Sequence, residues 1–279
     1  MTGAISAELL KLRKSWSTWI LGGVLVLGLF LLGYLLIYLL VQNPPPGDAG
    51  AQRGIAALKQ TLLPANVVPN VLGFLSSLGG PIALVIGALN SAREYSLRTI
   101  TAVLTQRPSR LGLLGAKTIA LAIVLGILAV ACFAVGVLGS LLVAALEWTG
   151  GSLPSIAEIA KGAAASWLIL GAWAALGFAL GMVLRSTGLA IGLGLVYALV
   201  IETVIAALGF ALSAFETVSR GLLGRNASAL AESFGQLNVG GGQNGAPVNA
   251  PATAALVLAA YVIGSLVVAA ILFIRRDVT

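Results

Sequence analysis

Six apolar stretches, each long enough to cross a lipid bilayer as an α-helix, occupy most of this 279-residue chain. A spanning helix needs about 20 apolar residues, and only helices or closed barrels satisfy every backbone polar group inside the hydrocarbon layer. The predicted spans cover residues 19–41, 68–89, 118–146, 163–184, 189–212 and 253–274. We therefore expect an all-α integral membrane protein in which residues 1–279 form a single transmembrane domain.

The scarcity of charged residues leads to the same fold class. Hydrophobic residues make up 59% of the chain and charged residues 9%, against about 25% charged in ordinary soluble domains. The chain has no histidine and one cysteine, so it lacks the commonest general base and the commonest metal ligand. We expect no catalytic residue, metal site or cofactor-binding site in this chain.

The distribution of lysine and arginine sets the predicted orientation. With both termini in the cytoplasm, eleven of the 16 basic residues lie on the cytoplasmic side, as the positive-inside rule requires. The net charge of +7 therefore reflects cytoplasmic loops, and no nucleic-acid partner is expected. The sequence predicts a multi-pass protein of the cell (inner, cytoplasmic) membrane, with membrane lipid as a partner.

Two segments outside the spans have amphipathic patterns. Residues 4–17 place apolar side chains on one helical face and Glu8 and Lys11 on another, which predicts a helix lying in the cytoplasmic membrane interface. Residues 213–252 join an amphipathic part to a glycine-rich part, a pattern compatible with an extracellular segment that re-enters the outer leaflet. Among the spans, only the second is clearly interrupted, at residues 79–81.

The connection between the second and third spans, residues 90–117, is far longer than two joined helices need. Its charged and apolar residues recur at helical spacing, as seen at Arg93, Leu97, Ile100 and Leu104. Pro108 then ends the pattern, because proline cannot continue a helix that requires its N–H. The segment predicts a short cytoplasmic helix with one charged and one apolar face.

The same connection carries the residues of a family pattern. They are Glu94, Leu97, Arg98, Thr99, Leu104, Thr105, Arg107, Pro108, Ser109 and Arg110, followed by Gly115, Ala116 and Lys117. Residues 8–14 before an aromatic-led first span and the ending at residues 275–277 are also typical. In this order on six spans, the chain resembles the ABC-2 type transporter permeases. It departs from them at residues 96–99, where the family usually has Gly-Thr.

The resemblance implies the transmembrane permease subunit of an ATP-binding-cassette (ABC) transporter, paired with a second copy or a homologue as a dimer. Separate ABC ATPase subunits would bind ATP and magnesium, so this chain would hold no cofactor and would not be an enzyme. The predicted cytoplasmic helix would be the coupling helix, with Glu94, Arg98, Arg107 and Arg110 contacting the ATPase. The competing interpretation is that these arginines anchor at phospholipid headgroups.

Glu202 is the only charged residue well inside a predicted span, and such residues are functional candidates because their burial is costly. Three interpretations are open. Its carboxyl group binds a cationic group, or hydrogen-bonds a neighbouring helix while protonated, or lies near the outer end of a shifted fifth helix. The spans otherwise lack a polar track for ions or sugars. This favours export of an amphiphilic or hydrophobic substrate such as a lipid, a peptide or a drug.

Two other functions remain open from the sequence. An ion-gradient-driven secondary transporter needs polar residues near the midplane and broken helices in both halves, and the chain offers one intramembrane acid and one clear interruption. A non-transporting membrane scaffold or immunity protein would have the same hydropathy pattern. A membrane enzyme is excluded, because the sequence has no residues from which to build a catalytic constellation.

Overall fold

The computed structural model describes residues 2–44, 49–96, 110–147, 151–211, 213–235 and 249–275. Within these ranges the chain forms helices and no strand. Six helical segments of this part of the chain are long and apolar enough to cross a membrane. The predicted all-α membrane fold with six spans is therefore confirmed.

Three spans are continuous helices and three contain a π-helical turn. The continuous ones are α8 (Arg110–Glu147), α9 (Ile156–Leu184) and α14 (Pro251–Arg275). The first span comprises α2 (Trp16–Phe30), η1 (Leu31–Leu35) and α3 (Leu36–Gln42). The second comprises η2 (Pro64–Asn66), α5 (Val67–Phe74), η3 (Leu75–Gly79) and α6 (Gly80–Ser96). The fifth comprises α10 (Thr187–Val196), η4 (Tyr197–Ile201) and α11 (Glu202–Ala211).

The prediction that only the second span is interrupted is wrong. There the π turn η3 directly precedes Gly80 and Pro81, and the proline removes a backbone donor and crowds the carbonyl four residues earlier. The turns η1 and η4 have no proline within them or directly after them. A π turn needs only one extra residue in the helix, so it can form without a proline to mark it in the sequence.

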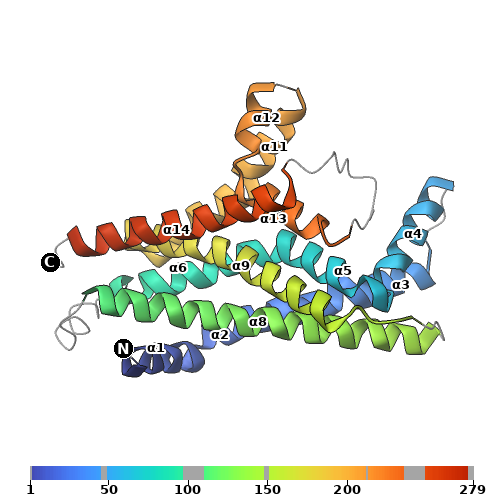
Figure 1. Cartoon of the computed structure of the whole chain (residues 1–279), viewed down its shortest axis with the longest axis horizontal. Helices are drawn as coiled ribbons and strands as arrows, with labels where there is room; N and C mark the ends of the chain where they lie inside the picture. The colour runs from blue at the N-terminus through green and yellow to red at the C-terminus, as the bar shows by residue number, and fades with distance from the viewer. Residues whose placement is uncertain are drawn as a thin grey trace.

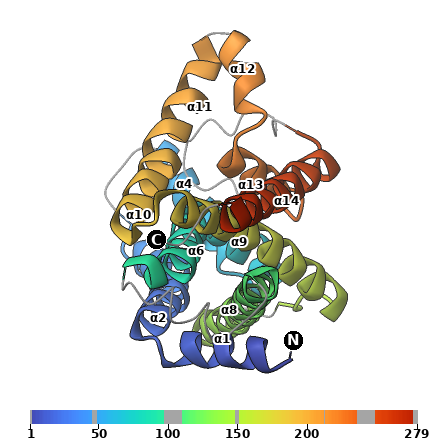
Figure 2. The same cartoon turned by 90° about the vertical axis from the view of Figure 1, so that its left-hand side faces the viewer.

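The spans run along the long axis of the molecule, except that α11, the second half of the fifth span, turns away from it (Figure 1). The helix α1 (Thr2–Lys14) and both chain ends lie at one end of the bundle, called here the terminal end. The helix α4 (Ala49–Thr61) lies at the opposite end, the far end. Viewed along the bundle, α1 crosses the terminal end beneath α2 and α8 (Figure 2), and it packs mainly against α8.

Two further helices follow the fifth span. The helix α12 (Ser213–Ser219) packs against α11, and these two helices project sideways from the other five spans in both views (Figures 1 and 2). The helix α13 (Leu223–Glu232) returns to the bundle and lies against α14, α5 and α9. The segment with the amphipathic pattern thus contains two short helices, of which the second is packed into the bundle.

The centre of the fold is a close pair of helices, α6 and α9. A Cβ atom at Gly177 of α9 would lie 2.0 Å from the Leu84 carbonyl oxygen of α6, and one at Gly87 of α6 would lie 1.9 Å from the Ala174 carbonyl oxygen. Small residues allow such close contact between backbones in membranes. In contrast, nothing lies within 4 Å of a Cβ built at Gly188 or Gly192 of α10.

Candidate functional site

The terminal end of the bundle brings together the two helices that flank the predicted coupling segment. The helix α6 ends at Ser96 and α8 begins at Arg110. Arg98 and Arg107 lie outside the described residues, and so do the side chains of Glu94 and Arg110. The contacts assigned to these four residues therefore stay predictions. The structure does describe the end of α6, the start of α8 and the residues packed around them.

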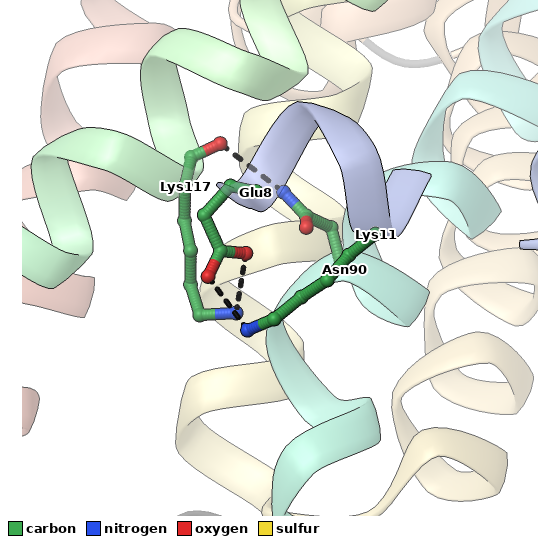
Figure 3. Close-up of polar contacts among 4 residues, drawn as sticks. All are labelled: Glu8, Lys11, Asn90 and Lys117. Carbon is green, nitrogen blue, oxygen red and sulfur yellow. Dashed lines mark hydrogen bonds and ion pairs between the residues drawn. The ribbon is translucent and has the colours of Figure 1, made fainter. Parts of the chain in front are cut away.

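A buried ion pair joins α1 to α8 at this end. The Glu8 Oε2 and Lys117 Nζ atoms are 3.3 Å apart, and the two side chains are 2% and 3% exposed. The other carboxylate oxygen of Glu8 lies 2.7 Å from Nζ of Lys11, which is half exposed (Figure 3). The carboxylate of Glu8 thus holds α1 against α8, because an ion removed from water is stable only beside a charge of opposite sign.

Hydrogen bonds extend this ion pair to α6 and α2. The Asn90 side chain donates to the Lys117 backbone carbonyl oxygen over 3.3 Å, which links α6 to α8 (Figure 3). The Arg93 guanidinium donates to the Ser15 hydroxyl over 2.8 Å, which links α6 to the start of α2. We call Glu8, Lys11, Ser15, Asn90, Arg93 and Lys117 the junction cluster. It joins α1, α2, α6 and α8 beside the predicted coupling segment.

The sequence did not identify the junction cluster. The amphipathic pattern separates Glu8 from the apolar face of α1, but the structure buries Glu8 together with Leu12 and Ser15, which follow it at helical spacing. The sequence does contain two signs of the cluster. Glu8 is an acidic residue in a basic segment, and Lys117 is a lysine at the start of an apolar stretch. Glu8 and Lys117 are 109 positions apart in the chain, so no local sequence pattern connects them.

The second candidate residue, Glu202, lies directly after η4 and is 7% exposed. Its Oε2 atom accepts a hydrogen bond of 2.8 Å from the backbone N–H of Gly224, the second residue of α13. The first N–H groups of a helix have no partner within it, and the helix dipole favours a carboxylate there. Glu202 therefore caps the start of α13 from another helix, while its other carboxyl oxygen, Oε1, is buried without a hydrogen-bond partner among the described residues.

Bulky aromatic side chains surround this contact. Trp173 of α9 is buried, and its ring centroid lies 6.3 Å from that of Tyr197 in η4. A Cβ atom at Gly224 would lie 2.2 Å from Glu202 Oε2 and 3.4 Å from Trp173, so only glycine lets the α13 backbone approach. The start of α13 is thus held where η4, α9 and α11 meet.

A polar network secures the turn before α13 from the other side. The Asn226 side chain donates to the Arg220 carbonyl oxygen over 2.9 Å and accepts from Asn249 over 2.8 Å. The Tyr261 hydroxyl of α14 donates to the Gly221 carbonyl oxygen over 3.0 Å. These bonds satisfy backbone groups that water would otherwise have to reach. The α12–α13 turn is therefore fixed to α14 as well as to Glu202.

The replacement Glu202→Ala is expected to loosen α13, whereas Glu202→Gln is expected to keep it in place. Alanine removes the acceptor for Gly224, and leaving a buried donor unpaired costs about 1–3 kcal/mol, which corresponds to roughly tenfold faster amide exchange. Glutamine retains a carbonyl oxygen at the same position. Hydrogen–deuterium exchange of residues 222–232 in the purified protein measures the difference.

The same pair of variants distinguishes capping from binding of a cationic cargo. If Glu202 binds a cation during transport, Glu202→Gln abolishes transport although exchange in α13 is unchanged. If its role is the cap, Glu202→Gln transports normally and Glu202→Ala does not. Equal exchange in α13 for both variants and the wild type would contradict the capping role.

The described residues contain no group of three His, Cys, Asp or Glu side chains placed to hold a metal ion. The model of a family described as ABC-2 family transporter protein matches residues 5–278. No curated protein matches the chain. The family match covers α1, all six spans and the segment between α6 and α8.

Proposed function

Because this chain belongs to the ABC-2 family of transporter proteins, we propose that it is the permease subunit of an ABC transporter that exports an amphiphilic or hydrophobic substrate. The observation that carries the proposal is the family match over nearly the whole chain, together with six helices suited to cross a membrane. ATP hydrolysis then takes place in separate ABC ATPase subunits. The permease works as a dimer with a second copy or a homologue.

The proposed coupling helix lies within residues 97–109, and its contacts come from Glu94, Arg98, Arg107 and Arg110. The connections among the helices on either side of the segment support this assignment. Its two flanking helices are joined by the Asn90 hydrogen bond to Lys117, and α1 is joined to α8 by the Glu8 ion pair. A movement applied to the segment therefore acts on α6, α8 and α1 together, which is what a separate motor needs to move membrane helices.

The proposed orientation places the terminal end, with both chain termini, in the cytoplasm of the cell that makes the protein. The positive-inside distribution supports it, since the basic residues of α1 lie at this end together with Arg93 and Lys117. The substrate class is supported by the spans themselves. Besides Glu202, the described parts of the spans carry their few charged side chains near their ends.

Reversing one charge in the proposed coupling segment is expected to release the ATPase. The tagged chain is affinity-purified from its native host in mild detergent. Glu94→Lys or Arg98→Glu should lower the amount of ABC ATPase recovered with it by about tenfold or more. The reason is that truncating one partner of a buried interfacial charge pair costs about 2–5 kcal/mol. Quantitative mass spectrometry of the bound proteins measures the loss. Lys161→Glu is the matched control, because Lys161 is exposed near the beginning of α9 at the far end.

Each result of this experiment has a clear meaning. Loss of the ATPase from the two coupling variants alone supports the permease function and the position of the coupling helix. Equal loss from Lys161→Glu would contradict the position of the coupling helix. If no ATPase is recovered even after cross-linking, the proposal fails and the ion-gradient-driven transporter is favoured. The π turns, which interrupt helices in both halves of the chain, support that alternative.

A further inference from the structure

We propose that the pocket beside the junction cluster binds the headgroup of an anionic phospholipid from the leaflet at the terminal end. The pocket has a volume of about 560 Å³ and lies between α1, the start of α2, the end of α6 and Lys117 of α8. The lipid would be held by the protein as a specific ligand, separately from the transported substrate and from any ATPase contact.

The charge of the pocket favours an anion. Among the described residues that line it, four are basic, namely Lys11, Lys14, Arg93 and Lys117, and one, Glu8, is acidic. That carboxylate is shared between Lys11 and Lys117. The hydrogen bond that Arg93 makes to Ser15 goes to a neutral hydroxyl group. Lys14 and Arg93 therefore offer the pocket positive charge that a phosphate group would neutralise.

The remaining lining favours an amphiphile over a soluble anion. Leu10, Leu21, Ile86 and Leu89 form its apolar wall. A nucleotide or free phosphate would leave such a wall in contact with water, whereas the glycerol and first acyl carbons of a phospholipid would cover it. The combination of apolar wall and basic side chains is the one that recognises acidic lipid headgroups at the ends of membrane helices.

Two exposed tryptophans place the pocket at headgroup depth. Trp16 and Trp19 lie at the start of α2 and are 82% and 66% exposed. The Trp19 indole donates a hydrogen bond of 2.6 Å to the Arg13 carbonyl oxygen at the end of α1. Exposed tryptophans with a polar partner of this kind lie at the boundary between acyl chains and headgroups. A lipid in this leaflet would therefore present its phosphate to Arg93 and Lys14.

The expected result is a preference of the purified full-length chain for an anionic lipid. In native mass spectrometry with detergent-solubilised protein, one dioleoyl phosphatidylglycerol should bind about tenfold more tightly than dioleoyl phosphatidylcholine, which has the same acyl chains. Arg93→Gln and Lys14→Gln should remove this preference. Arg13→Gln should retain it, because Arg13 lies on the same helix as Lys14 and loses the same charge but does not line the pocket.

Four results would overturn the proposal. Equal binding of the two lipids excludes headgroup recognition, and equal loss in Arg13→Gln reduces the effect to general attraction by basic residues. Glycerol 3-phosphate that competes as well as the whole lipid would show a soluble phosphate site. If Arg93→Gln does not fold, the exposed Lys14 carries the test alone. Loss of the lipid when the ATPase subunit binds would assign the pocket to that subunit.

Discussion

Replacing Gly177 with alanine is expected to lower the stability of the protein by about 3 kcal/mol or more, at the upper end of the usual effect of overpacking. The added Cβ atom would lie 2.0 Å from the Leu84 carbonyl oxygen and 2.8 Å from its carbonyl carbon. Both are backbone atoms of α6, so no side chain can turn aside to make room. The two central helices would have to separate along their contact.

The single cysteine provides the measurement for this variant. Cys132 is the only cysteine in the chain and is fully buried in α8. A thiol-reactive fluorescent dye therefore reports unfolding when the protein is heated in detergent. Gly192→Ala is the matched control, since nothing lies within 4 Å of its Cβ position and alanine favours a helix by up to about 1 kcal/mol over glycine. Equal melting of the two variants would contradict the close packing of α6 and α9.

Removing one partner of the buried ion pair is the second change with a large expected effect. Glu8→Gln leaves the charge of Lys117 buried without its carboxylate, and breaking a buried pair in this way costs about 3–5 kcal/mol. The double variant Glu8→Leu with Lys117→Met removes both charges and fills similar space. It should recover most of that loss, because neither charge then remains to be solvated.

Thermal unfolding with the same thiol dye measures these variants, and limited trypsin cleavage after Lys11, Arg13 or Lys14 reports release of α1. Glu216→Gln is the control, because it breaks an ion pair with Arg220 in which both side chains are more than half exposed. Such pairs contribute about 0–1 kcal/mol, so this variant should melt like the wild type. A double variant as unstable as Glu8→Gln would show that the charge pair is not the source of the effect.

How much of this structure a sequence predicts depends on the range of the interaction concerned. The six spans follow from local hydropathy, because each must match the thickness of the bilayer on its own. The glycines at 177 and 181 also indicate close packing, but only the structure shows that their partner is α6. The Glu8 ion pair depends on how α1 folds back onto α8, which no periodicity within α1 records.

Glu202 illustrates the same limit from the other direction. Its position within an apolar stretch makes it a candidate without any structure. The sequence leaves open whether its carboxyl group binds a cargo, hydrogen-bonds another helix or lies at the membrane boundary. No sequence pattern indicates the contact with Gly224, which is 22 residues further along and reaches Glu202 only because α11 and α12 form a hairpin. The four residues of the predicted coupling segment remain predictions of the family pattern.

The π turn η4 determines the rotational phase of everything that follows it in the fifth span. It directly precedes Glu202, and in a regular α-helix each residue turns the chain by about 100° around its axis. Losing the one extra residue of η4 would therefore swing the carboxylate of Glu202 to another side of the helix, away from Gly224. A change in the winding of a single turn would uncap α13. The winding of the fifth span and the attachment of α13 to it therefore change together.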